Sequence, residues 1–409
     1  MAGQNGTIVL GPAATLALAV VTAVGPAGGH SDASAQVTRD SAGIRIVENA
    51  RPADDSRLPW RIGSEPVVSI GEVVGEEPYL LDLVSAAIVL PDGRVVVANT
   101  GTNELRVYDA AGVHVATWGR RGEGPGEFMN LAGVDVWPGD SVVAWDYRNR
   151  AISVFDSGGT FGRSFVLESG TDRPLEPRFA FSDGSFLGRH GEVTGRGQRR
   201  SKVSYERRDG DGGRWRDYGT HDGVESFEGA IGGGIPFTVA RLPFSRGLHT
   251  ARWSDLVIIT PDDEYHIHAY DGTDGSLARI VRREHANRAP TGAEAEQALE
   301  RALERTGFDA RMLDMVRDGF KDVPVVESFP AFRTLLTDPL DHLWVRETTF
   351  PDADRPAPLW TVFDPEGKAL GFIETPDGLT IYEIGADYLL GQATDEMGVE
   401  SVQVWGLER

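Results

Sequence analysis

The chain has 409 residues, with 40 Lys and Arg against 62 Asp and Glu, a net charge of −22 and no Cys. The lack of Cys excludes disulfides, thiolate zinc sites, Cys nucleophiles and a lipid-modified N-terminal Cys, and the acidic balance argues against binding to nucleic acid phosphates. The 50 Gly and 23 Pro are too many turn formers for an all-helical protein.

Residues 1–35 have the features of an export signal. Residues 7–25 are uncharged and mostly apolar, and Ala33-Ser34-Ala35 is a small-residue cleavage site directly before Gln36. Residues 1–6 contain no Lys or Arg, which departs from the usual signal peptide. The alternative is an uncleaved N-terminal anchor, because the apolar run nearly reaches the ~20 residues needed to span a membrane. Both alternatives predict an exported protein, either periplasmic, extracellular or at the cell surface.

A hairpin pattern recurs along the rest of the chain. Each copy is a short apolar strand, a tight turn containing Asp, and a second strand rich in apolar residues. Asp-Gly and similar pairs favour such turns because they tolerate positive φ. The copies are residues 88–98, 134–145, 179–188, 250–260, 334–345 and 382–391.

A second hairpin follows each of these copies, beginning with an alternating strand that ends in an aromatic residue and Asp, or a close variant. These strands are residues 105–112, 152–159, 203–210, 267–275, 360–367 and 402–408. Four strands per unit and six units predict an all-β fold, a six-bladed β-propeller of four-stranded blades over residues 81–409. The last unit ends after its third strand. We therefore expect the N-terminal segment, 36–80, to supply a ring-closing strand from residues 43–50 or 66–72.

Residues 291–324 break the β pattern between the fourth and fifth units and predict a short helical insertion. Thr291 and Glu294 form a capping box, and apolar residues recur at helical spacing between 295 and 303. Asp309 is expected to cap a second helix. The insertion is expected to pack on the propeller surface as a helical hairpin, with a partner-binding lid as the alternative.

The first two units are similar to NHL repeats. The glycine-rich loop contains Gly119, Gly122, Gly124, Pro125, Gly126 and Phe128, and the strand after the next polar turn contains Arg150, Ile152, Phe155 and Asp156. The chain thus resembles the NHL-repeat-like six-bladed β-propeller family, closely in the first two units and less clearly in the others. We expect an exported propeller that acts as a binding or scaffold module. The alternative is a channel-site enzyme of lyase or lactonase type, with or without a metal.

The histidines do not form a metal-ligand set that the sequence identifies. His266 and His268 point to one face of a strand, but no third ligand lies in register with them. His249, on an innermost strand, and His190, after a second strand, are expected to converge. The lyases that the repeats resemble use several channel histidines, and no such set stands at matching positions. We therefore expect no metal and no cofactor, favour binding over catalysis, and assign no catalytic residue.

Arginines gather on one predicted face. In a propeller, the loops entering the innermost strands and those joining second to third strands share a face. The ligand-binding candidates on this face are Arg120, Arg121, Asp146, Arg148, Arg150, Arg178, Arg189, His190, His249, Arg333, Arg346 and Glu347. A loop of the third unit is expected to add Arg196, Arg199, Arg200 and Lys202.

The arginine face predicts the kind of partner. Because a guanidinium fork suits carboxylate and phosphate groups, we expect an anionic small molecule, glycan or protein, no nucleic acid, and no membrane contact beyond an N-terminal anchor. The protein is expected to be a monomer. The alternative interpretation is a solvated loop face with internal ion pairs.

Overall fold

The computed structural model describes residues 36–166, 175–192, 197–231, 235–304, 309–352 and 357–409. The predicted export segment, residues 1–35, lies outside these ranges. The described chain is built mainly of antiparallel β-strands, joined by one short 3-10 helix, η1 (Glu77–Tyr79), and two α-helices. None of the helices in the described ranges is both long and apolar enough to cross a membrane.

The described strands form six sheets that follow the order of the chain. The first sheet contains β5 (Val84–Val89), β6 (Val95–Asn99), β7 (Glu104–Tyr108) and β8 (His114–Trp118). The second contains β9 (Leu131–Trp137), β10 (Ser141–Asp146), β11 (Ala151–Phe155) and β12 (Phe161–Val166). The third contains β13 (Glu176–Ala180), β14 (Phe186–Glu192), β15 (Gly197–Arg208), β16 (Arg214–Ile231) and β17 (Ile235–Val239).

The remaining three sheets repeat the arrangement. The fourth contains β18 (Leu248–Trp253), β19 (Leu256–Pro261), β20 (His266–Asp271) and β21 (Leu277–Arg283). The fifth contains β22 (Phe332–Thr337), β23 (Leu343–Glu347), β24 (Leu359–Phe363) and β25 (Ala369–Glu374). The sixth contains β26 (Thr380–Ile384), β27 (Tyr388–Thr394) and β28 (Glu400–Glu408).

The N-terminal segment adds strands to two of these sheets. β1 (Val37–Ser41) pairs with β2 (Ile44–Asn49), and β2 runs parallel to β21 in the fourth sheet. β3 (Arg61–Ile62) and β4 (Val68–Ile70) both pair antiparallel with β28 in the sixth sheet. Of the two segments expected to complete the last unit, residues 66–72 contain a strand beside β28, whereas residues 43–50 lie in the fourth sheet.

The recurrent Asp after the third strand closes a turn. Oδ1 of Asp109 accepts the backbone N–H groups of Ala111 and Val113, both at 2.9 Å. Asp156 accepts those of Gly158 and Thr160 in the same way. The aromatic-Asp pattern therefore marks the point where a strand ends and its side chain stabilises the turn that follows.

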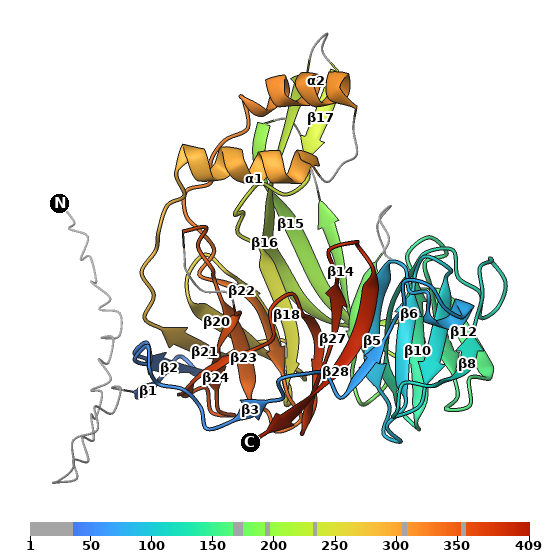
Figure 1. The fold of residues 1–409 in the computed structure, drawn as a ribbon. Coiled ribbons are helices and arrows are strands. Elements are labelled where there is room, and N and C mark those ends of the chain that lie inside the picture. The colour runs from blue at the N-terminus through green and yellow to red at the C-terminus, as the bar shows by residue number, and fades with distance from the viewer. Residues whose placement is uncertain (1–35, 167–174, 193–196, 232–234, 305–308, 353–356) are drawn as a thin grey trace, which may run out of the picture. The chain divides into compact units, whose positions relative to one another are not determined.

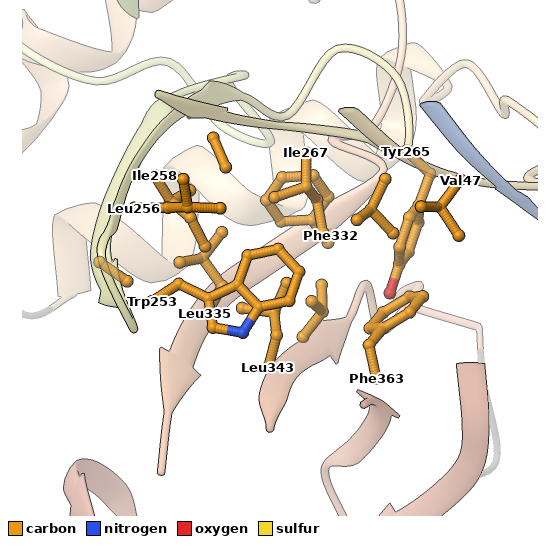
Figure 2. Close-up of a cluster of buried hydrophobic side chains, with 14 of the residues drawn as sticks. Val47, Trp253, Leu256, Ile258, Tyr265, Ile267, Phe332, Leu335, Leu343 and Phe363 are labelled. Atoms are coloured by element: carbon orange, nitrogen blue, oxygen red, sulfur yellow. The ribbon is translucent and has the colours of Figure 1, made fainter. Parts of the chain in front are cut away.

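The core lies between the faces of consecutive sheets. Figure 2 shows Trp253 and Ile258 of the fourth sheet packed with Phe332, Leu343 and Phe363 of the fifth. The first strands of the sheets contact one another: β5 contacts both β9 and β26, and β22 contacts both β18 and β26. These first strands surround a common channel, since residues from all of β5, β9, β13, β18, β22 and β26 line it.

The third sheet differs from the expectation. Residues 199–202, predicted to lie in a loop, belong to β15, which has 12 residues and pairs with the 18-residue β16. The loop prediction was wrong because this polar stretch pairs with β16, with a register shift between Arg200 and Lys202. Arg196 lies outside the described residues.

Two helices occupy the predicted helical stretch. α1 (Gly292–Glu304) begins at the expected capping box, where Thr291 and Glu294 exchange hydrogen bonds. α2 (Ala310–Phe320) begins at Asp309, whose side chain accepts the N–H of Met312 at 2.8 Å. α2 contacts β16 (Figure 1).

Candidate functional site

A β-bulge recurs in the first strand of five of the six sheets in the described chain. In each case a register shift leaves one residue of the first strand unpaired with the second strand. These bulged residues are Ser85, Ala132, Arg178, Arg333 and Tyr382. β18 pairs with β19 without such a shift. Because a bulge redirects a side chain at the point where it occurs, the third and fifth sheets place Arg178 and Arg333 at equivalent positions.

Three arginines beside this end of the channel have no acidic partner among the described residues: Arg241, Arg333 and Arg346. Burial lowers the pKa of Arg333, and the positive charges of Arg241 and Arg346 lower it further, against the opposing effect of Asp262. Burial also lowers the pKa of Arg346, with Asp377 opposing the effect. Nε of Arg346 is buried and has no hydrogen-bond partner in the described chain. These guanidinium groups are therefore close enough to repel one another, and no carboxylate forms an ion pair with them in the described chain.

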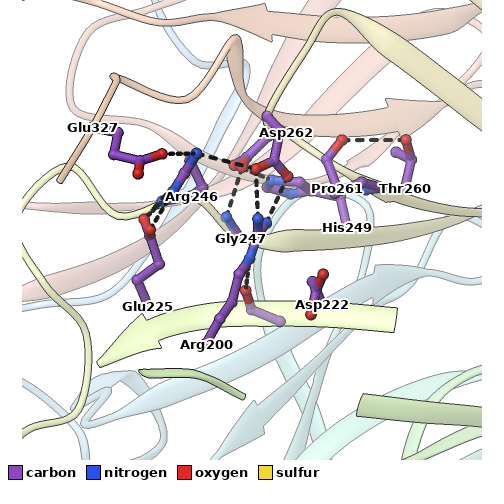
Figure 3. A network of polar contacts seen from close by, with 12 residues as sticks. Arg200, Asp222, Glu225, Arg246, Gly247, His249, Thr260, Pro261, Asp262 and Glu327 are labelled. Carbon is purple, nitrogen blue, oxygen red and sulfur yellow. Dashed lines mark hydrogen bonds and ion pairs between the residues drawn. The ribbon is translucent and has the colours of Figure 1, made fainter. Parts of the chain in front are cut away.

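His249 and Asp262 form a histidine–aspartate pair (Figure 3), and the charge of Asp262 also acts on Arg333. Nε2 of His249 is 2.9 Å from Oδ2 of Asp262, and the imidazole packs against Phe332 with ring centres 5.2 Å apart. Gly247 leaves space here: a Cβ at this position would lie 3.5 Å from Nη2 of Arg241, 3.6 Å from Oδ2 of Asp262 and 3.9 Å from Nε2 of His249. We call Arg241, His249, Asp262, Arg333 and Arg346 the mouth cluster.

A second set of charges behind the mouth cluster is fully paired. Arg246 donates to both carboxylate oxygens of Glu225, at 2.5 and 3.3 Å, and lies 3.4 Å from Asp263. Arg200 forms a bidentate pair with Asp263, at 2.5 and 2.6 Å. These contacts join β15 and β16 to the segments that flank β18 and β19. Arg200 and Arg246 therefore stabilise the packing between the third and fourth sheets.

Two acidic residues predicted on the contact face are structural instead. The carboxylate of Asp146 is buried and accepts four backbone N–H groups, from Met129, Asn130, Arg148 and Asn149. The carboxylate of Glu347 pairs with the buried Arg283 at 2.7 and 2.9 Å and accepts the hydroxyls of Tyr265 and Thr361. The acceptor capacity of both carboxylates is used within the protein, so neither is counted in the cluster described above.

The predicted arginines fall into different environments. Arg120 and Arg189 are neutralised by Glu127, at 2.6 Å, and by Glu176, at 2.9 Å, so neither is free for a partner. The other arginines make no side-chain ion pair in the described chain and are exposed: Arg121, Arg148, Arg150 and Arg178. His190 contributes a buried Nδ1 without a described hydrogen-bond partner.

The sequence analysis did not identify three charged residues in the first strands that line the channel: Asp135, Arg252 and Glu383. Each lies in a first strand among apolar neighbours. A charged residue within an otherwise apolar first strand is the sequence feature that could have identified them as channel residues. In the described ranges, no group of three or more His, Asp or Glu side chains is arranged to hold a metal ion.

No family model matches the chain, and no curated protein matches it. The chain is similar to a solved structure from Bacteroides fragilis named as an exported protein, with 12% identity, a TM-score of 0.48, and coverage of 89% of this chain and 99% of that one. A gluconolactonase from Xanthomonas campestris aligns with 14% identity and a TM-score of 0.38, over 80% and 88% of the two chains. Virginiamycin B lyase from Staphylococcus aureus aligns with 9% identity and a TM-score of 0.37, over 86% and 99%. At such values the function has to be argued from the site.

Proposed function

We propose that this chain is an exported, NHL-like six-bladed β-propeller that binds a carboxylate-bearing ligand, such as an acidic glycan, at the mouth cluster. Each of the six sheets is one blade in this proposal, β3 and β4 complete the sixth blade, and the helices are an insertion between the fourth and fifth. The order of the sheets and the contacts among their first strands support this architecture. The apolar run and Ala33-Ser34-Ala35 support export.

The observation that carries the ligand class is the uncompensated charge of Arg333 and Arg346. Nε of Arg346 is buried without a partner in the described chain, which costs free energy, and a ligand that supplies an acceptor recovers it. Arg333 is exposed beside it and adds positive charge that a ligand can reach. The planar fork of Arg pairs bidentately with a carboxylate. A neighbouring Asp262 limits the total positive charge, which favours discrete carboxylates over a dense polyphosphate.

Binding can be measured by isothermal titration calorimetry with citrate and with a trimer of galacturonic acid. The double variant Arg333→Ala/Arg346→Ala is expected to lose the binding of both probes. Arg301→Ala/Arg311→Ala is the matched control, because it removes two exposed arginines of α1 and α2. Wild-type affinity should fall as salt shortens the Debye length from ~10 Å at 0.1 M to ~3 Å at 1 M. Equal losses in both double variants would show that only net charge matters.

A second candidate function is acid–base catalysis at the same cluster, favoured by the contact between His249 and Asp262. A carboxylate on one imidazole nitrogen fixes the tautomer and orientation of the ring, and a histidine held in this way beside a bound carboxylate is suited to removing a proton from the adjacent carbon. Incubation with the galacturonate trimer tests this function. Loss of the C5 proton to His249 and cleavage of the C4–O glycosidic bond, whose oxygen leaves as a hydroxyl after taking up a proton, would create a C4=C5 double bond that absorbs ultraviolet light. His249→Gln should retain binding and abolish that product.

A further inference from the structure

The channel between the first strands is a cavity of about 1400 Å³. This volume exceeds the ~300–1,000 Å³ of most small-molecule sites. Much of its wall is aliphatic, with side chains from four different sheets: Val89, Val134, Val136, Leu335, Leu336 and Ile381. A ligand that enters the channel therefore meets a largely apolar surface.

Two of the five carboxylate residues that line the channel, Asp135 and Glu383, are committed to the fold; the other three are Asp338, Asp341 and Asp387. Oδ2 of Asp135, on β9, accepts the N–H of Ala180 in the third sheet at 2.9 Å. Oε2 of Glu383, on β26, accepts the N–H of Val89 in the first sheet at 3.1 Å, and its other oxygen accepts the hydroxyl of Tyr388. Each carboxylate thus joins the first strand of its own sheet to that of a neighbour. Burial also raises the pKa of Glu383, which favours its uncharged form.

Two arginines line the channel, Arg178 and Arg252, and the hydrogen-bonding capacity of Arg252 is only partly used. Nη1 donates to Oδ2 of Asp135 at 3.2 Å and to the carbonyl of Ala180, whereas Nη2 lies 3.5 Å from Oδ1 of Asp135. Nε has no hydrogen-bond partner in the described chain, and the side chain is 41% exposed. The guanidinium also lies over the ring of Phe179, 5.4 Å from its centre. Its Nε–H and the second N–H of Nη2 are therefore available to a ligand.

A second polar group of the wall is unsatisfied. The side chain of Trp145 lines the channel and is 6% exposed, yet its indole Nε1 has no hydrogen-bond partner among the described residues. The indole lies across Gly133, where a Cβ would come within 2.2 Å of the ring. Glycine at this position thus allows the indole to form part of the wall. A buried indole N–H normally has an acceptor, and a ligand is one source of it.

We propose that the channel is a second binding site, separate from the mouth cluster, which takes a monocarboxylic acid with an extended apolar body. Arg252 binds the carboxylate through Nε and Nη2, and the aliphatic wall contacts the hydrocarbon. A cationic amphiphile of the same length lacks the group that Arg252 recognises. This site does not depend on the mouth cluster, so either proposal can fail without the other.

The test is calorimetry of the mature protein with decanoate below its micellar concentration, and with decyltrimethylammonium as the cation of matched length. Wild-type protein is expected to bind one decanoate and not the cation. Arg252→Gln is expected to weaken decanoate binding at least tenfold, and Arg252→Lys to restore it in part, because Lys keeps the charge without the fork. Arg333→Ala/Arg346→Ala should bind decanoate as wild type does.

A second variant covers the case in which Arg252→Gln fails to fold. Val136→Trp leaves the pair between Arg252 and Asp135 intact and fills the channel from an exposed position of β9, so it should block decanoate. The proposal is overturned if wild-type protein does not bind decanoate, if it binds the cation equally well, or if folded Arg252→Gln and Val136→Trp proteins both bind decanoate as wild type does.

Discussion

The carboxylate of Asp262 holds His249 with one oxygen and the backbone of Gly247 with the other. Oδ2 lies 2.9 Å from Nε2 of His249, and Oδ1 accepts the N–H of Gly247 at 2.6 Å. Asp262 is 1% exposed. One buried side chain therefore positions both the histidine of the mouth cluster and the loop that leads into β18.

Replacing Asp262 by Ala should destabilise the protein by about 1–3 kcal/mol, because the buried N–H of Gly247 loses its acceptor. Asp262→Asn keeps one oxygen acceptor and should cost less. Urea denaturation of the wild type and both variants measures the difference. Equal midpoints for Asp262→Ala and wild type would show that the N–H of Gly247 finds another acceptor.

Replacing Arg346 by Met should leave the protein as stable as the wild type or stabilise it by up to about 2 kcal/mol, because the variant removes a buried, unpartnered Nε and keeps an aliphatic chain of similar length. The same variant should weaken citrate binding. Thermal melts with and without citrate measure both effects. Arg301→Met, on the exposed face of α1, is the control and should change neither quantity. A clear loss of stability in Arg346→Met would mean that Arg346 supports the fold.

The raised pKa of Glu383 predicts a pH dependence of stability. The group titrates near 4.5 in the unfolded chain and at a higher pH in the folded protein, mainly because of burial. The folded state therefore binds the proton more tightly, and its stability falls as pH rises from about 4.5 through the raised pKa. Glu383→Gln removes this loss, so the variant should gain stability relative to wild type between pH 4.5 and 8.

Denaturation of wild type and Glu383→Gln across that range measures the gain, and Glu408→Gln, at an exposed position of β28, is the control. A difference between wild type and Glu383→Gln that does not vary with pH would contradict the prediction.

Truncation should separate the roles of the N-terminal strands. Removing residues 36–50 takes away β1 and β2 and leaves β21 as an exposed edge, so the protein should fold with reduced stability. Removing residues 36–72 also takes away β3, β4 and the buried Ile70 beside β28, which opens a long strand edge. Open edges template association, so the longer truncation should aggregate. Light scattering after size-exclusion chromatography distinguishes the two, and a monomeric, cooperatively melting longer truncation would contradict the assignment.

The sheets could be predicted because their signals are local. The alternation of apolar residues, and turn aspartates such as Asp109 and Asp156, determine structure within a few residues of where they occur. The four-strand repeat can therefore be recognised in the sequence. The capping box at Thr291 and Glu294 is local in the same sense. The N-terminal strands were harder to assign because β2 pairs with a strand more than 200 residues away, and both candidate segments have the pattern of a strand.

The candidate site was only partly predictable. The topology rule selected His249, Arg333 and Arg346, which the structure brings close to one another. It could not distinguish them from Asp146 and Glu347, because the donors that occupy those carboxylates come from other loops and from another sheet. The bulges at Arg178 and Arg333 depend on pairing across two strands, and no residue type in the sequence marks them. The charged residues of the channel wall can be found in the sequence. The residues that they contact in other sheets cannot, because those contacts depend on how the sheets pack.

The pairing of β4 with β28 also determines when the molecule can finish folding. Ile70 contacts its partner Val402 across almost the whole chain, so the sixth sheet cannot be completed until the last residues have been synthesised. Closing such a long loop before any contact is gained slows folding. Until the N-terminal strands dock, the edge of β28 is unprotected, and an open strand edge favours association. Refolding should therefore be limited by the docking of the N-terminal strands, after the internal hairpins have formed.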